Sequence, residues 1–161
     1  TGERMKKQDI CVREMTPADA HAVFDIDRIC FSEVWSEQIF LDLFQYTSNH
    51  YYVAEQGHTL CGFAGISVAG DTADVMKIGV LPEYRRMGAA QQLLQMLLVK
   101  AKETGCEQVM LEVRESNAAA RQLYRKNEFE ELAVRKQYYT QPVENGIVMN
   151  RKLTDFSTVR Q

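Results

Sequence analysis

The chain has 161 residues, of which 45% are hydrophobic and 25% are charged. This length and composition suit one domain over residues 1–161 and exclude the disordered, collagen-like and disulfide-stapled classes. Nineteen lysines and arginines against 22 aspartates and glutamates give a formal net charge of −3. This balance argues against a general nucleic-acid binder. No apolar run approaches ~20 residues, so the sequence predicts no membrane-spanning helix.

The four cysteines lie far apart and form no Cys-x-x-Cys pair; they are Cys11, Cys30, Cys61 and Cys106. With only three histidines beside them, no spacing typical of a metal site emerges. Each lies in an apolar stretch and no signal peptide precedes them, so we expect buried, reduced thiols in a cytoplasmic protein; two disulfides are the alternative. Residues 1–8 are interpreted as a flexible leader foreign to the fold and 155–161 as a tail.

The predicted elements begin with a strand over residues 10–15, where apolar and polar side chains alternate. The segment Thr16-Pro17-Ala18-Asp19 is typical of a helix start, and apolar residues at helical spacing continue from there to Cys30. A second helix is predicted from Ser36, with an apolar stripe formed by Ile39, Phe40, Leu43 and Phe44.

From residue 51 the pattern changes to three β-rich runs over 51–56, 59–68 and 73–80, which predict an antiparallel meander. A long amphipathic helix follows and ends at Gly105. We then expect a central strand over 109–113, a helix over 117–126 with Ser116 as its N-cap, and strands over 129–139 and 147–153. This order predicts an α/β fold with a single mixed, mostly antiparallel sheet of about seven strands, flanked by about four helices.

The segment from Val80 to Ala90 joins a predicted strand to the long helix. A helix N-terminus presents unpaired N–H groups and a positive dipole end, which together suit a phosphate. Gly88 has no Cβ to block close backbone approach, and Arg85 and Arg86 add positive charge. The alternative is an ordinary glycine near a helix start, with solvated arginines beside it.

The pattern Arg85-x-x-Gly88-x-Ala90, after two helices and a meander, resembles the acetyl-CoA signature of the GNAT acetyltransferases, Gln/Arg-x-x-Gly-x-Gly/Ala. Farther on, residues 111–120, Leu123-Tyr124 and 127–129 are similar to the RimI branch. Members of that branch acetylate the N-terminal α-amine of a small-subunit ribosomal protein. The resemblance runs from about Ile10 to Leu153, and its three motifs keep the family's order and spacing.

The resemblance implies the GNAT fold, acetyl-CoA as cosubstrate and no metal. It implies that backbone groups of Ile78, Gly79 and Val80 meet the pantetheine arm and the acetyl carbonyl, and that Asn117 also contacts the cofactor. The loop that encloses the pyrophosphate is then Arg85, Arg86, Met87, Gly88, Ala89 and Ala90. Glu112 matches the family's proton acceptor, and Tyr124 matches its proton donor to the departing thiolate.

The chemistry needs such a pair, because an amine attacks a thioester only when neutral and the expelled sulfur anion benefits from a proton. At reference pKa values roughly a tenth of an α-amine is neutral at pH 7, against about one part in a few thousand for lysine. A carboxylate base is therefore adequate for a protein N-terminus. The plain alternatives are that Glu112 pairs with Arg114 or water, that Tyr124 only packs, and that Asn117 is a first-turn polar residue.

In RimI-like proteins the acceptor peptide lies between the first helix–helix turn and the last hairpin. Trp35 lies in that turn, next to Val34 where the family has proline, and either lines the peptide groove or packs the second helix on the core. Tyr138 and Tyr139 match the family's tyrosine pair and either hold a peptide backbone or pack across strands. Residues 144–146 read Glu-Asn-Gly where the family has Glu-Asp-Ala, so a charge is lost near the expected entrance.

The sequence therefore predicts an enzyme that transfers acetyl from acetyl-CoA to a protein N-terminal α-amine, with a small-subunit ribosomal protein as the candidate acceptor. We expect no direct nucleic-acid or membrane partner. One alternative is transfer to a small-molecule amine such as a polyamine or an antibiotic; the tyrosine pair favours a peptide. The other is a non-catalytic acyl-CoA-binding regulatory module, against which the presence of both Glu112 and Tyr124 argues.

Overall fold

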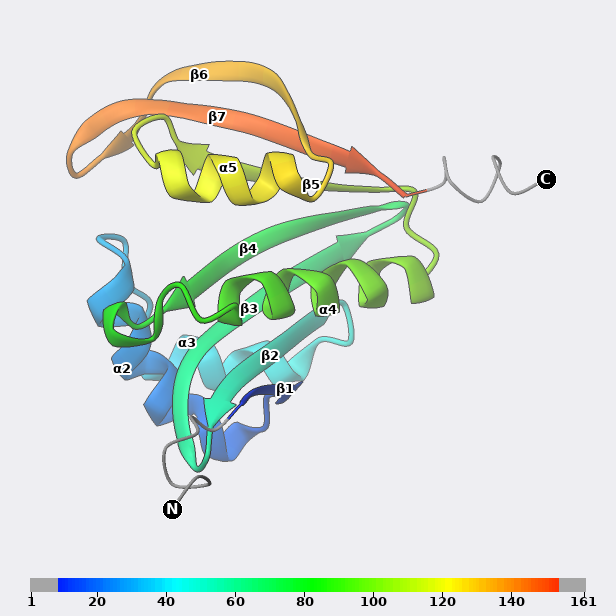
Figure 1. Cartoon of the computed structure of the whole chain (residues 1–161). Helices are drawn as coiled ribbons and strands as arrows, with labels where there is room; N and C mark the ends of the chain where they lie inside the picture. The colour runs from blue at the N-terminus through cyan, green and yellow to red at the C-terminus, as the bar shows by residue number, and fades with distance from the viewer. Residues whose placement is uncertain (1–8, 154–161) are drawn as a thin grey trace. The chain divides into compact units, whose positions relative to one another are not determined.

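The computed structural model describes residues 9–153 (Figure 1), so the predicted leader over 1–8 and the tail over 155–161 lie outside the described residues. The strands are β1 (Ile10–Glu14), β2 (Asn49–Gln56), β3 (Thr59–Ala69), β4 (Thr72–Val80), β5 (Gln108–Arg114), β6 (Glu130–Thr140) and β7 (Val143–Lys152). The α-helices are α2 (Ala20–Cys30), α3 (Glu37–Asp42), α4 (Ala89–Glu103) and α5 (Ala118–Lys126), with short 3-10 turns at Pro17–Asp19, Leu43–Gln45 and Pro82–Tyr84.

The seven strands have the order β1-β2-β3-β4-β5-β7-β6. β1 pairs antiparallel with β2, and β7 pairs antiparallel with both β5 and β6. β4 and β5 are parallel, and their pairing extends only over Thr72–Asp74 and Gln108–Met110. The predicted mixed, mostly antiparallel α/β sheet with four helices is confirmed.

The chain divides into two compact units. Among the described residues the first unit comprises 9–65 and 77–96, and the second comprises 66–76 and 97–153. The candidate site residues therefore fall into two groups, one in each unit. The expectation of one domain over 1–161 stays a prediction. No helix within residues 9–153 is long and apolar enough to cross a membrane.

The first unit is built around apolar side chains from α2, α3, β2 and β3 (Figure 1). The ring of Phe40 is fully buried and lies 5.6 Å, centroid to centroid, from that of Phe63. The helix predicted from Ser36 is present as α3, and Ser36 is its N-cap, because its side chain accepts a hydrogen bond from Ile39 N. The predicted apolar stripe is wrong at Ile39 and Phe44, which are exposed. α3 has only six residues before the chain tightens into a 3-10 turn, so a 3.6-residue stripe does not persist.

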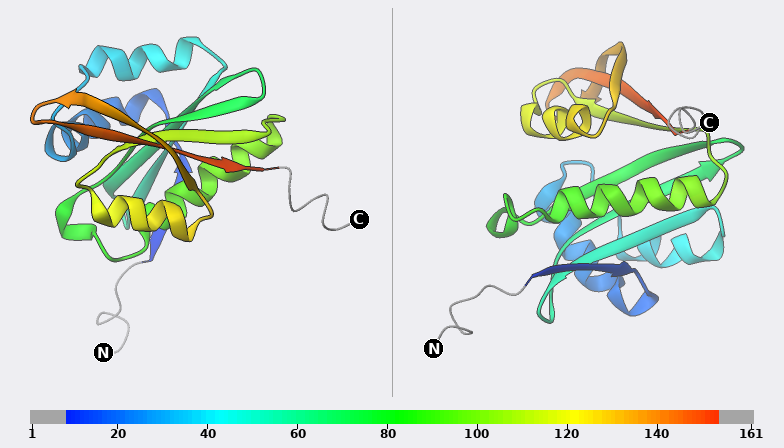
Figure 2. Two further views of the ribbon diagram at one scale, coloured as in Figure 1. Left: turned by 90° about the horizontal axis from the view of Figure 1, so that it is seen from above. Right: turned by 45° about the vertical axis from the view of Figure 1, so that its right-hand side comes forward.

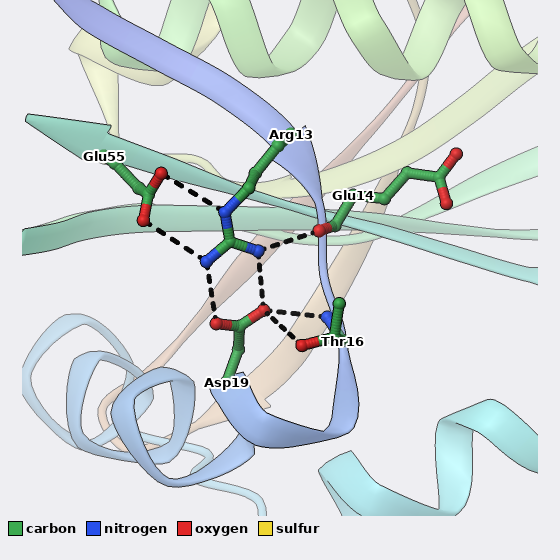
Figure 3. A network of polar contacts seen from close by, with 5 residues as sticks. All are labelled: Arg13, Glu14, Thr16, Asp19 and Glu55. Carbon is green, nitrogen blue, oxygen red and sulfur yellow. Dashed lines mark hydrogen bonds and ion pairs between the residues drawn. The ribbon is translucent and has the colours of Figure 1, made fainter. Parts of the chain in front are cut away.

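Polar contacts fix the start of the first helical segment (Figure 3). Arg13 on β1 donates two hydrogen bonds of 2.9 Å to the Asp19 carboxylate and one of 3.2 Å to Glu55 on β2. Asp19 also accepts a hydrogen bond of 2.8 Å from Thr16 N, so the helix start read from the sequence is present. The hydrogen bonds from Arg13 hold the pKa of Asp19 below its ordinary value.

In the second unit, β6 and β7 lie side by side along their length in every view (Figures 1 and 2). The side chains of β5 alternate between a buried face and a half-buried face, and Glu112 belongs to the half-buried one. The predicted N-cap of α5 is wrong. Asn117 is the cap and accepts from Ala120 N at 3.1 Å, whereas Ser116 donates through its N–H and hydroxyl to Glu144.

All four cysteines are free thiols. Cys61 and Cys106 are buried as predicted, and Cys30 is half-buried. The prediction of burial is wrong for Cys11, whose position on β1 alternates with that of buried Ile10 and faces outward.

Candidate active site

In the first unit, the end of β4 lies against the chain that follows α2. A Cβ on Gly79 would meet Phe31 Cε2 at 2.9 Å, so this close approach requires glycine. The next carbonyl, that of Val80, accepts a hydrogen bond of 2.9 Å from Arg85 Nε and one of 3.4 Å from Cys30 Sγ. The Arg85 side chain is therefore held against the end of β4 by this hydrogen bond. Burial raises the pKa of the Cys30 thiol, with nearby Arg85 opposing the shift.

The loop between this strand end and α4 leaves several amides unpaired. Arg86 and Gly88 have positive φ angles of 66° and 86°, and a Cβ on Gly88 would have no neighbour within 4 Å. Helix α4 begins with the hydrogen bond from Gln92 N to Gly88 O. Within residues 9–153, no backbone hydrogen bond is donated by the amides of Arg86, Met87, Gly88, Ala89 and Ala90. Unpaired amides at the positive end of a long helix fit a phosphate or pyrophosphate.

Trp35 is partly buried against the core of the first unit. Its ring centroid lies 5.3 Å from that of Phe40, and its backbone N–H donates a 2.7 Å hydrogen bond to Asp27 Oδ2. The ring also lies 4.3 Å from Lys77 Nζ. Sequence reasoning missed Lys77 and Asp27; the available signal for Lys77 was a lysine between apolar neighbours near the end of a strand.

In the second unit, Glu112 forms an ion pair with Arg135 on β6. The alternative pairing with Arg114 is wrong, because Arg114 is engaged elsewhere. It contacts Glu144 at 3.1 Å and donates to the carbonyls of Gln141 and Pro142 in the β6–β7 turn. Sequence reasoning missed Arg135, because its contact with Glu112 depends on which strand lies beyond β7.

The two predicted tyrosines lie edge to face, with ring centroids 5.0 Å apart. Each ring carries a guanidinium: Arg135 is 4.3 Å from the centroid of Tyr138, and Arg114 is 4.3 Å from that of Tyr139. An irregularity in β6 separates Arg135 from Tyr139 in the β6–β7 register. Tyr138 remains exposed.

Tyr124 on α5 is 8% exposed, and its ring centroid lies 5.7 Å from that of Phe129. Burial, with a smaller contribution from Tyr139, raises the pKa of the Tyr124 phenol to about 12. The Tyr138 ring thus contacts Arg135, the ion-pair partner of Glu112, while Tyr139 contributes to the raised pKa of Tyr124. Asn117 caps the helix that carries Tyr124. No group of three potential metal ligands occurs in the part of the chain that the structure describes.

Comparison with known proteins identifies the family. The family described as "Acetyltransferase (GNAT) family" matches residues 20–129. N-alpha-acetyltransferase RimI of Mycobacterium tuberculosis is 33% identical over 154 residues, which cover 92% of this chain and 96% of that protein. The ribosomal protein bS18-alanine N-acetyltransferase of Escherichia coli K12 is 31% identical over 140 residues, which cover 86% of this chain and 94% of that protein.

The fold is likewise shared with a RimI-type enzyme. The crystal structure of the ribosomal-protein-S18-alanine N-acetyltransferase from Escherichia coli has a TM-score of 0.81 at 30% identity, and covers 89% of this chain and 93% of that chain. The chain therefore belongs to the GNAT acetyltransferase family, whose acetyl donor is acetyl-CoA, and is similar to its RimI members over most of its length.

Proposed function

We propose that this enzyme acetylates the N-terminal α-amine of a protein in the cytoplasm, and that ribosomal protein S18 is its acceptor. The observation that carries the proposal is the tyrosine pair Tyr138–Tyr139, each ring under a guanidinium, connected through Arg135 to the Glu112 carboxylate. Tyr138 is exposed and Tyr139 is half-buried, and tyrosine hydroxyls can both donate to and accept from the polar groups of a peptide backbone. The names of the relatives from Escherichia coli support S18 as the acceptor.

Apart from Asn117, the residues that would hold the cosubstrate belong to the first unit. The unpaired amides of residues 86–90, at the N-terminus of α4, would bind the pyrophosphate, and Arg85 and Arg86 would add positive charge. The backbone of Ile78, Gly79 and Val80 would accompany the pantetheine arm. Asn117, whose side-chain oxygen caps α5, would contact the cofactor through its amide nitrogen. Bound acetyl-CoA supplies the thioester that the amine attacks.

Glu112 would accept a proton from the acceptor amine, while Tyr124 would donate a hydrogen bond to the departing sulfur. Overall, one proton leaves the nitrogen as the C–N bond forms, and one proton ends on sulfur as the C–S bond breaks. In this structure Arg135 contacts the Glu112 carboxylate, so the incoming amine must share or replace that contact. Without a base, only the small neutral fraction of an α-amine reacts near neutral pH.

The function is tested by incubating the enzyme with acetyl-CoA and a peptide that copies the N-terminus of ribosomal protein S18 and contains an internal lysine. Mass spectrometry of fragments is expected to find one acetyl group, on the first residue. The same peptide with a blocked N-terminus is the control and should stay unmodified. Acetylation of the lysine alone, or of polyamines in preference to the peptide, would contradict the proposal.

Gly88→Ala is expected to weaken acetyl-CoA binding about tenfold, because the added methyl group narrows the open side of the loop where the pyrophosphate would lie. The φ of 86° also adds backbone strain of about 1–2 kcal/mol, which lowers the stability of the protein. Calorimetric titration with acetyl-CoA measures the change in Kd. Gly105→Ala is a matched control, since Gly105 has a φ of 90° and also has no neighbour within 4 Å of a Cβ. Both variants should lose similar stability, but only Gly88→Ala should lose affinity. If the two variants bind acetyl-CoA with equal affinity, the loop of residues 85–90 is not part of the cofactor site.

A further inference from the structure

A lysine inside the first unit is held by four groups, of which one lies on α2 and three lie on the chain that follows α2. Lys77 on β4 is 8% exposed. Its Nζ donates a 2.6 Å hydrogen bond to Asp27 Oδ1 and a 3.0 Å hydrogen bond to the Glu33 carbonyl. The same nitrogen lies 4.7 Å from the ring centroid of Phe31 and 4.3 Å from that of Trp35. The ammonium is therefore enclosed by one carboxylate, one carbonyl and two aromatic faces.

Asp27, the partner of Lys77, is 0% exposed and uses both carboxylate oxygens. Oδ1 accepts from Lys77, and Oδ2 accepts from Trp35 N at 2.7 Å. The two side chains together bind the carbonyl of residue 33 and the N–H of residue 35. Val34 lies between these two fixed points.

Residues 31–36 form neither helix nor strand, so their conformation depends on such contacts. A proline at position 34 would fix its own φ. Val34 lacks that restraint and is exposed. Lys77 and Asp27 instead restrain the backbone on either side of Val34 through hydrogen bonds.

Stability alone does not explain the buried pair. Removing two charges from water costs several kcal/mol per ion, and well-packed apolar residues in the same place often give equal or greater stability. Burial lowers the pKa of Lys77, and Asp27 opposes the shift. Because apolar residues in the same place could give similar stability, the distinctive effect of the pair is on the geometry of the segment that it binds.

We propose that Lys77 and Asp27 are positioning residues that fix the loop of residues 31–36, and with it the Trp35 ring, for binding of the acceptor peptide. The inference rests on the proposed function, because it takes Trp35 as part of the peptide site. Neither residue touches reacting atoms in this assignment. Their loss acts on peptide binding through the position of Trp35 and leaves the loop of residues 85–90 unchanged.

The test is the apolar double variant Asp27→Leu/Lys77→Met, which removes both charges and so avoids an unpaired buried ion. Its KM for the S18 peptide is expected to rise about tenfold or more, since small misplacements of binding groups have effects of this size. Its KM for acetyl-CoA should change by less than about twofold. Trp35 is the only tryptophan of the chain, so its fluorescence anisotropy decay reports directly on the loop and should show greater mobility.

Adding Val34→Pro to the double variant is the rescue experiment. Proline restores a local restraint between residues 33 and 35, and no hydrogen bond from the Val34 N–H is found within residues 9–153. Peptide KM and Trp35 anisotropy should both return toward wild-type values. A residue that acts only through overall stability would show no such recovery.

Asp19→Asn is the matched control, because it weakens another ion pair of the first unit, that with Arg13, without touching residues 31–36 (Figure 3). It should lower Tm but leave peptide KM and Trp35 anisotropy unchanged. A folded double variant with wild-type peptide KM and anisotropy would overturn the inference. If the wild-type enzyme does not acetylate the peptide, the proposed function fails, and unchanged anisotropy in the double variant would then still reject the positioning role.

Discussion

Replacing Glu112 by glutamine is expected to lower kcat for the S18 peptide by about 10²–10⁴-fold, the usual contribution of a general base. Glutamine keeps the shape of the side chain and its ability to accept a hydrogen bond from Arg135, but it cannot take a proton from the amine. The KM for acetyl-CoA should not change, because Glu112 is proposed to act on the acceptor. Steady-state kinetics with each substrate varied in turn measure both quantities.

The loss cannot be ascribed to unfolding. Glu112 pairs with Arg135, whose side chain is 54% exposed. Ion pairs this accessible to solvent contribute only about 0–1 kcal/mol to the free energy of unfolding, so Tm should change little. Glu130→Gln, an exposed position on the same strand as Arg135, makes the same charge change and should leave kcat unaltered.

The pH dependence separates a base from a residue that only orients the peptide. An α-amine becomes largely neutral by itself above about pH 8, so the deficit of Glu112→Gln should shrink there. An orienting residue would give the same deficit at every pH. A variant with wild-type kcat at neutral pH would show that water or another group takes the proton.

Sequence periodicity predicted most elements of this fold because their signals are local. The alternation over residues 108–114 matches a strand with one buried face, and Gly105, with a φ of 90°, ends the segment of α4 as expected. The positive φ at Gly88 is local in the same sense. In each case the residue type indicates the conformation of its own backbone or the side of the strand on which its side chain lies.

Partners contributed by distant strands could not be predicted in this way. Glu112 contacts Arg135 instead of Arg114 because of the order β5-β7-β6 and the irregularity of β6. The spacing of residues along the chain predicts neither of these features. Asn117 caps α5 instead of Ser116 because Glu144, 28 residues away, engages Ser116. Lys77 and Asp27 are 50 residues apart and meet only in the folded chain.

Tyr124→Phe is expected to lower kcat by about 10²–10³-fold, the range found when one donor to a developing anion is removed. The change deletes a single oxygen. Within residues 9–153 no hydrogen bond to the Tyr124 hydroxyl is found, so its loss should cost little stability. Tyr51→Phe is a matched control, because Tyr51 is also buried, its pKa is also raised by burial, and its hydroxyl has no partner. That variant should retain wild-type kcat.

The raised pKa decides how the phenol can act. At about 12, above the ordinary value of 10.0, Tyr124 stays protonated at any working pH. Thiols ionise near about 8.5, so complete transfer of the phenol proton to a thiolate is uphill by about 3–4 pKa units. Tyr124 would therefore stabilise the departing sulfur chiefly through a hydrogen bond that strengthens as charge develops. The kcat profile should show no alkaline decline from this group below about pH 11, whereas an unperturbed phenol would begin to ionise at about pH 9. A decline at the lower pH that Tyr124→Phe abolishes would contradict this role.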